Sequence, residues 1–242
     1  MRYQGAIFDI DGVLIDTPHE RAWREALDRL MSGPWQALAT EANYTPGSLT
    51  SVLYQANVAG KPRLAGAAAA LSAVGLSDPS GELTQRYAAE KQAMIDELIE
   101  RGAFERFADG EQLLLRLKAA RLRVAAASSS KNANAFLARV AIAPGKSMLT
   151  LFDANLCGRD FAQGKPHPAI FLAAAAALSL PPAVCLVFED APAGIEAAKA
   201  AGMYAVGIAR LDDADLLRAA GADLVVSDMN MIDCTGEAFA PH

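Results

Sequence analysis

Apolar residues along the chain change their spacing near residue 102. From residue 18 to this point the periodicity predicts helices and loops without a convincing strand, with helices over 18–31 and 63–73 and a long helix that follows Asp78-Pro79 and ends at Gly102. After it, short apolar runs alternate with helical segments. These runs predict strands over 123–127, 152–156, 184–188, 204–208 and 223–226, separated by helices over 111–120, 131–140, 168–178, 191–201 and 213–219.

One more apolar run, residues 6–10, predicts a strand near the N-terminus. Continuous apolar strands that alternate with helices are typical of a parallel sheet covered on both faces. The pattern therefore predicts a Rossmann-like, doubly wound α/β core formed by residues 1–16 and 101–242. An all-helical domain, residues 17–100, is inserted after the first strand. Thr17 is the expected N-cap of the first inserted helix, with Pro18 at N1 and Glu20 completing a capping box.

The segment AIFDIDGVLIDT, residues 6–17, places two aspartates one residue apart in the first apolar run. Positions i and i+2 of a strand point to the same face, so Asp9 and Asp11 are expected to share one side. Burying two like charges together is costly unless a cation or hydrogen bonds compensate. The pair is therefore a candidate reaction centre. The alternative is a strand-end turn with two solvated acids.

Further polar residues follow the other predicted strands. Ser128-Ser129-Ser130 comes after the second strand, Lys165 precedes a helix beyond the third, and Glu189-Asp190 ends the fourth. In doubly wound sheets the ligand crevice lies outside the carboxyl ends of the strands, so these side chains are expected to converge at one edge. The alternatives are that the serines and acids only cap the helices that follow and that Lys165 is a surface lysine.

Composition narrows the class of protein. The chain has 242 residues, of which 52% are hydrophobic, and a net charge of −6. This composition supports a substantial core and argues against a nucleic-acid partner. Cys157, Cys185 and Cys234 show no C-x-x-C spacing, so no disulfide framework is expected. No stretch approaches the roughly 20 apolar residues of a membrane span, and no long apolar signal region begins the chain. These features predict a cytoplasmic protein without a membrane partner.

The ordered motifs resemble those of the haloacid dehalogenase-like phosphotransferases. This family combines a DxDGVLxDT motif, here residues 9–17, with a serine or threonine after the second strand, a lysine and an acidic pair. Three further stretches are similar to its β-phosphoglucomutase branch and the related sugar phosphatases: SSSKNANAFL at 128–137, GKPHPAIF at 164–171 and FEDAPAGIEAAKAAGM at 188–203.

The resemblance implies a role for each core residue. Asp9 is the nucleophile that takes the phosphoryl group, and Asp11 protonates the leaving oxygen and deprotonates the incoming one. Mg²⁺ offsets the negative charge, bound by Asp9, Asp190, Glu189 and the backbone carbonyl of Asp11. The remaining residues implied at the phosphoryl group or the substrate are Ser128, Lys165, Ser130, Lys131 and Asn132.

The same resemblance makes residues 17–100 a mobile cap whose closure excludes water. Arg63 matches the cap arginine that grips a distal phosphate, and His19 with Trp23 matches the first cap helix of the mutase. Three departures from the pattern of the mutase leave both mutase and phosphatase activity as possible functions. The segment before His19 is short, the second cap lysine has only Lys91 as a candidate, and Ala191 stands where serine is common.

The expected function is Mg²⁺-dependent phosphoryl transfer on a sugar phosphate by a β-phosphoglucomutase-like enzyme. The partner is then a small phosphorylated metabolite, and a monomer is expected. One alternative is a phosphatase of the same fold that hydrolyses a small phosphate monoester. An alternative from another class is a catalytically silent module that binds a phospho-ligand.

Overall fold

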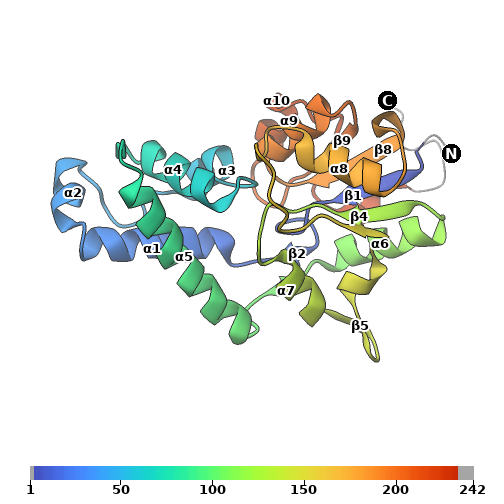
Figure 1. The fold of residues 1–242 in the computed structure, drawn as a ribbon, viewed down its shortest axis with the longest axis horizontal. Helices are drawn as coiled ribbons and strands as arrows, with labels where there is room; N and C mark the ends of the chain where they lie inside the picture. The colour runs from blue at the N-terminus through green and yellow to red at the C-terminus, as the bar shows by residue number, and fades with distance from the viewer. Residues whose placement is uncertain (1–2, 234–242) are drawn as a thin grey trace. The chain divides into compact units, whose positions relative to one another are not determined.

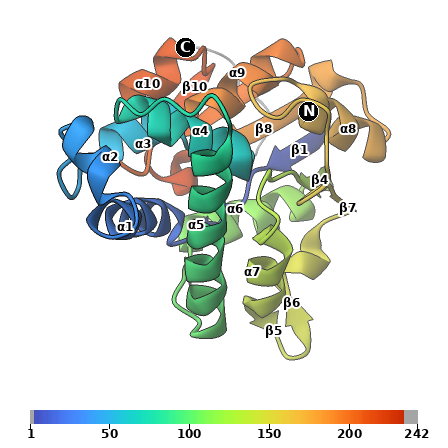
Figure 2. The same ribbon diagram turned by 60° about the vertical axis from the view of Figure 1, so that its left-hand side comes forward.

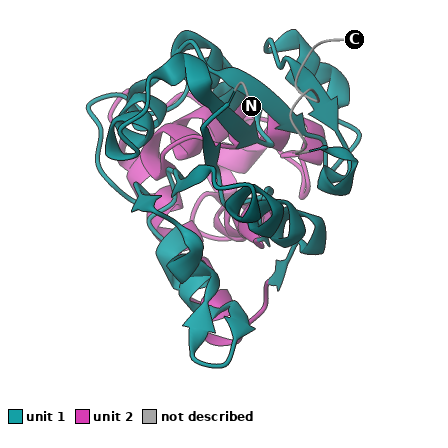
Figure 3. Cartoon of the chain, turned by 90° about the vertical axis from the view of Figure 1, so that its right-hand side faces the viewer, with its two compact units in different colours: residues 1–16, 105–242 teal, residues 17–104 magenta. Residues whose placement is uncertain are grey.

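The computed structural model describes residues 3–233, so Cys234 and His242 lie outside the described residues. The chain divides into two compact units (Figure 3). One combines the N-terminal residues up to 16 with residues 105 onward, and the other is residues 17–104. Within the described residues, no helix is long and apolar enough to span a membrane.

A parallel sheet of six strands forms the centre of the first unit (Figure 1). Its order is β10-β9-β8-β1-β4-β7, with neighbours paired in parallel. The strands are β1 (Gly5–Phe8), β4 (Arg123–Ala126), β7 (Ala154–Asn155), β8 (Cys185–Glu189), β9 (Tyr204–Ile208) and β10 (Leu224–Val226). This sheet confirms the predicted doubly wound α/β core with a helical insertion after the first strand.

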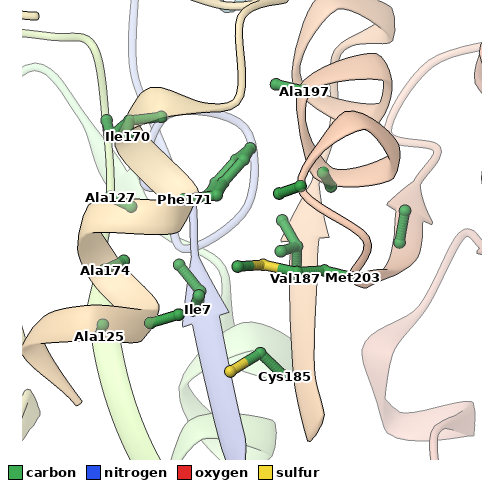
Figure 4. Packing of buried hydrophobic residues seen from close by; sticks show 14 of the residues in the cluster. Ile7, Ala125, Ala127, Ile170, Phe171, Ala174, Cys185, Val187, Ala197 and Met203 are labelled. Atoms are coloured by element: carbon green, nitrogen blue, oxygen red, sulfur yellow. The ribbon is translucent and has the colours of Figure 1, made fainter. Parts of the chain in front are cut away.

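Helices alternate with these strands along the chain. They are α6 (Ala108–Ala119), α7 (Ala133–Arg139), α8 (Ala169–Ala177), α9 (Pro192–Ala200) and α10 (Ala214–Ala219). One apolar cluster joins Ile7 of β1 and Val187 of β8 to Phe171 of α8, and all three are fully buried (Figure 4). Neighbouring strand residues alternate in direction, so Phe8 faces the other way and stacks on Phe188 at 4.6 Å between ring centroids. The sheet is therefore apolar on both faces.

The second unit contains only helices and loops among its elements (Figure 2). The helices are α1 (His19–Ser32), α2 (Gln36–Glu41), α3 (Ser51–Asn57), α4 (Arg63–Ala73) and α5 (Glu82–Glu100). Helix α1 packs on α5, where Trp23 meets Tyr87 edge-on at 5.0 Å. The Tyr87 hydroxyl donates to the Trp23 carbonyl oxygen at 2.7 Å, which satisfies the polar group of this buried tyrosine.

The predicted capping box at the start of α1 does not form. Pro18 is the N-cap residue, and no side chain caps this helix. The carboxylate of Glu20 instead accepts from the Ser51 hydroxyl at 2.6 Å and from Arg24 at 3.3 Å. A serine of α3 and an arginine of α1 itself therefore replace the capping contact that the sequence pattern predicts.

Two other predicted elements are shorter than expected. Strand β7 covers only two of residues 152–156, because the carboxylate of Asp153 accepts the Val124 N–H at 2.8 Å in place of a backbone carbonyl. Helix α5 begins at Glu82 instead of directly after Asp78-Pro79, and the Asp78 carboxylate accepts the Thr84 N–H of its first turn at 2.7 Å.

Two antiparallel pairs and three short 3₁₀ helices were not predicted, since segments of two to four residues show no periodicity. Strand β2 (Ile15–Asp16) pairs with β3 (Glu105–Arg106) where the chain leaves and re-enters the first unit. The other elements are β5 (Ala141–Ala143) with β6 (Lys146–Ser147), η1 (Met148–Leu151), η2 (Pro182–Val184) and η3 (Met229–Met231).

Candidate active site

Strand β1 ends at Phe8, so Asp9 and Asp11 lie in the turn beyond it and not within the strand. The premise that both aspartates lie within a strand is therefore wrong, but the two carboxyl groups are near each other, since besides burial the charge of Asp11 contributes to raising the pKa of Asp9. The turn is closed by its own backbone, because the N–H groups of Leu14 and Ile15 both donate to the Ile10 carbonyl oxygen, at 2.9 and 3.0 Å. Asp9 is buried, which is unfavourable for a carboxylate without a partner.

Lys165 supplies that partner. Its Nζ lies 2.6 Å from Asp9 Oδ1 and 2.7 Å from Glu189 Oε2, and its side chain is fully buried. The ammonium also lies 5.0 Å from the centre of the Phe171 ring. The surface alternative for Lys165 is excluded, since three segments far apart in the sequence meet at this one charge.

Three carboxylates gather around this ammonium. Oxygen atoms of Asp9, Glu189 and Asp190 all lie within 4.8 Å of one another. Burial raises the pKa of Glu189 to about 8, although Lys165 opposes the shift. Burial also raises the pKa of Asp190, with further contributions from the charges of Glu189 and Asp9. One ammonium is therefore too little positive charge for this cluster in its ionised form.

The cluster fits a hard divalent cation. Glu189 Oε1 is buried and has no hydrogen-bond partner among residues 3–233, although its other oxygen binds Lys165. A buried carboxylate oxygen without a donor is costly, and oxygen atoms of this kind are the ligands that Mg²⁺ prefers. These residues thus offer both the donor atoms and the unbalanced charge that a bound Mg²⁺ would satisfy.

Two glycines make room for the acids. A Cβ atom at Gly12 would lie 1.9 Å from Asp190 Oδ2, and one at Gly194 would lie 2.0 Å from Glu189 Cδ. Gly194 is in the first half of α9, so the Glu189 side chain packs directly on the backbone of that helix. Sequence analysis missed the role of Gly194, for which its position five residues after Glu189 is the only signal.

Ser128 joins the site from the loop after β4. The Ser128 side chain is buried. Its hydroxyl donates to Asp11 Oδ2 at 3.2 Å and accepts the Ser130 N–H at 3.1 Å. The Ser130 hydroxyl in turn accepts the Asn132 N–H at 3.2 Å. These serines therefore shape the loop before α7, and the Ser128 hydroxyl also donates to the carboxylate of Asp11.

Lys131 extends toward a neighbouring loop of the same unit. Its Nζ donates to the Gly158 carbonyl oxygen at 2.7 Å and to Asp160 Oδ1 at 2.5 Å. Both charged side chains are largely exposed to solvent. The contact is an exposed ion pair, so it holds the ammonium only weakly.

In the helical unit, His19 and Lys91 meet between α1 and α5. Lys91 Nζ lies 3.2 Å from His19 Nδ1 and 5.0 Å from the centre of the Trp23 ring, and both His19 and Lys91 are buried. A buried lysine is uncommon. The sequence made Lys91 a candidate only through the family resemblance, as the available match to a second cap lysine. Arg63, the first residue of α4, is partly buried.

The two described cysteines are small core residues. Cys157 and Cys185 are both free and buried. Burial raises the pKa of Cys157 to about 12 and that of Cys185 to about 11, so both thiols are protonated at neutral pH. Neither has the thiolate character that a nucleophile or a metal ligand requires.

The chain is similar to known proteins over most of its length. Residues 3–202 match the family described as haloacid dehalogenase-like hydrolase. A β-phosphoglucomutase of Bacillus subtilis (strain 168) is 34% identical over 232 residues, which cover 92% of this chain and 88% of that protein.

Two further proteins resemble the whole chain. The crystal structure of an archaeal β-phosphoglucomutase from Pyrococcus sp. strain ST 04 superposes with a TM-score of 0.69 at 31% identity and covers 95% of both chains. A phosphorylated carbohydrates phosphatase of Thermotoga maritima is 29% identical over 240 residues, which cover 98% of this chain and 100% of that protein. The relatives thus include both a mutase and a phosphatase.

Proposed function

The chain belongs to the haloacid dehalogenase-like hydrolases, and we propose that within this family it is a β-phosphoglucomutase that transfers a phosphoryl group through Asp9. Membership makes it an enzyme, and its relatives include phosphoglucomutases and a phosphatase of phosphorylated carbohydrates. The observation that carries the proposal is the contact of Lys165 with Asp9 and Glu189. It holds the buried carboxylates of Asp9 and Glu189 beside one positive charge.

The chemistry follows from two carboxylates with different surroundings. Asp9 Oδ1 accepts a hydrogen bond from Lys165. The other carboxylate oxygen of Asp9 attacks the phosphorus atom as the bond from phosphorus to the sugar oxygen breaks. Asp11, positioned by the Ser128 hydroxyl, gives its proton to the leaving sugar oxygen. In the second step Asp11 takes the proton of the incoming hydroxyl, which attacks the phosphorus and regenerates the Asp9 carboxylate.

Asp9, Glu189, Asp190 and the backbone carbonyl of Asp11 are the proposed ligands of Mg²⁺. When bound, this ion neutralises the charge that accumulates on the phosphoryl oxygens. Lys165 adds a second positive charge at the nucleophile. The Ser128 hydroxyl and the neighbouring backbone N–H groups are the proposed donors to the phosphoryl oxygens.

The helical unit supports the mutase assignment. His19 and Lys91 place two polar nitrogen atoms 3.2 Å apart on buried side chains, which is a costly arrangement for a purely structural helix pair. We assign His19, Lys91 and Arg63 to the sugar phosphate, together with Ser130, Lys131 and Asn132 of the sheet unit. A phosphatase is the second candidate, favoured by the Thermotoga maritima relative and by the absence of a hydroxyl at Ala191.

Phosphorus NMR tests the proposal directly. Wild-type enzyme and Asp9→Asn, purified in parallel, are incubated with Mg²⁺, β-glucose 1-phosphate and a trace of glucose 1,6-bisphosphate. Glucose 6-phosphate formed by the wild type and lost in the variant supports the mutase. Free phosphate identifies a phosphatase instead. No turnover of this sugar or of a phosphate-ester panel would overturn both and leave a module that only binds a phospho-ligand.

A further inference from the structure

Arg210, two residues beyond β9, binds the backbone of the turn that carries Asp11. Its Nε donates to the Gly12 carbonyl oxygen at 3.1 Å, and its Nη2 donates to the Val13 carbonyl oxygen at the same distance. These residues are almost 200 positions apart in the chain. The side chain of Arg210 is 17% exposed, so these hydrogen bonds are mostly shielded from water.

Asp109, in the first turn of α6, holds the same guanidinium from another side. It accepts two hydrogen bonds from Arg210, at 2.8 and 3.0 Å, in the bidentate geometry that orients a guanidinium group most strictly. It also accepts the Met229 N–H at 2.9 Å, which ties it to the segment after β10. The Phe107 ring lies 3.9 Å from Arg210 Cζ. The direction of the guanidinium is therefore fixed by contacts along its edges and against one face.

The turn that Arg210 binds sets the positions of the acids. Asp9, Asp11 and Gly12 follow one another within four residues, and the Gly12 Cα lies against the Asp190 carboxylate, where even one added carbon would collide with it. A shift of the Gly12 backbone would therefore change the space available to Asp190 and the path of the chain at Asp11.

We propose that Arg210 and Asp109 are positioning residues for phosphoryl transfer, which hold the Gly12–Val13 turn so that Asp9, Asp11 and Asp190 keep their arrangement. Neither residue touches the reacting atoms in this arrangement. The kinetic part of the inference rests on the proposed function, whereas the structural part does not. Lysine cannot replace arginine here, because one ammonium cannot reproduce the flat fork that serves two carbonyls and a carboxylate.

The chain offers a matched control. Arg116 of α6 also donates to two backbone carbonyl oxygens, those of Ile232 at 2.9 Å and Met229 at 3.0 Å. These two hydrogen bonds hold the C-terminal segment and not the turn after β1. Arg116→Met thus removes an equal number of backbone contacts by arginine in the same unit.

The first readout is amide hydrogen exchange, followed residue by residue by NMR in Arg210→Lys, Asp109→Asn and Arg116→Met. The amides of Gly12, Leu14 and Ile15 report on the turn. They are expected to exchange about tenfold faster in the Arg210 and Asp109 variants, while β8 and β9 keep their protection. Equal acceleration throughout the sheet, or the same acceleration at the turn in Arg116→Met, would overturn the inference.

The second readout separates kcat from KM. Arg210→Lys and Asp109→Asn are expected to lower kcat about 10- to 100-fold with little change in KM, because misplaced acids affect the chemical step more than substrate binding. Arg116→Met is expected to keep the wild-type kcat. A wild-type kcat in Arg210→Lys would overturn the positioning role. If the wild-type enzyme itself shows no turnover, the proposed function fails and the exchange measurement alone decides this inference.

Discussion

Gly12 and Asp190 fit together so closely that a Cβ atom at Gly12 would lie 1.9 Å from Asp190 Oδ2. The backbone of Gly12 has a φ of +79°, which non-glycine residues adopt only at a cost. Two independent constraints therefore require glycine at this position. One is the left-handed conformation of the turn, and the other is the carboxylate beside it.

Gly12→Ala is expected to lower kcat about 100-fold, because the added methyl group displaces Asp190 by an ångström or more. The matched control is Gly202→Ala, where φ is +74° and nothing lies within 4 Å of the added carbon. Both variants are expected to lose about 1 kcal/mol of unfolding free energy from the left-handed conformation. Kinetics and urea unfolding separate the two effects. An equal loss of kcat in Gly202→Ala would contradict the explanation.

Lys165→Met is expected to lower the free energy of unfolding by about 3 kcal/mol, since it leaves Asp9 and Glu189 buried without their ammonium partner. Added Mg²⁺ is expected to raise the melting temperature of this variant more than that of the wild type, because the variant has one positive charge fewer at the acids. Urea unfolding and thermal melts measure both quantities.

The control for this variant is Lys131→Met. Its ion pair with Asp160 is largely exposed, so its removal is expected to cost less than about 1 kcal/mol. Equal losses of stability in the two lysine variants would show that the buried ammonium does not stabilise the acidic cluster.

Asp109 links stability to pH. Burial by itself would raise the pKa of this carboxyl, but hydrogen bonds from Arg210 and from the Met229 N–H hold it below its usual value. The stabilisation is therefore complete above about pH 4, the ordinary pKa of aspartate, and is lost as the pH falls through the lower folded-state value. Asp109→Asn is expected to cost about 2 kcal/mol of unfolding free energy at pH 7.

The difference in unfolding free energy between wild type and Asp109→Asn is the quantity to measure, because it removes the contribution of all other carboxyl groups. This difference is expected to shrink as the pH falls below about 4. A difference that is constant from pH 7 to pH 3 would mean that the carboxylate charge of Asp109 does not contribute.

His19→Gln is expected to reduce the formation of glucose 6-phosphate about tenfold, because it removes the imidazole that contacts Lys91 in the interior of the helical unit. The control is His167→Gln, which changes an exposed ring whose Nδ1 accepts the Ala169 N–H at 3.3 Å. Phosphorus NMR follows both variants on the same substrate. Unchanged turnover in His19→Gln would remove this residue from the proposed site.

The sheet could be predicted from the sequence because its strands are buried on both faces. Strand β9, for example, is predicted at its observed bounds, Tyr204–Ile208. Strands β2 and β3 were missed because Asp16, Glu105 and Arg106 show no alternation. They pair because the chain leaves the sheet unit after Asp16 and re-enters it beside the same residue at Glu105.

The approach of polar residues to one edge of the sheet could also be predicted, because parallel strands end on the same side. The contact of Lys165 with Glu189 depends on how a loop folds back over the sheet, and no periodic pattern encodes that. Arg210 and Asp109 were missed for the same reason. Each is an ordinary surface charge in the sequence, and only the tertiary structure brings them together, 101 residues apart.

The pairing of Asp16 with Glu105 has a consequence for how such proteins diverge. The segment between them begins and ends at a single point of the sheet unit, so its length does not strain the strands on either side. Such a segment can be replaced by another of different length or sequence while the register of β1 and β8 stays the same. With the proposed substrate residues His19, Lys91 and Arg63 in this segment and the proposed nucleophile Asp9 outside it, substrate choice and reaction chemistry would evolve separately within one gene.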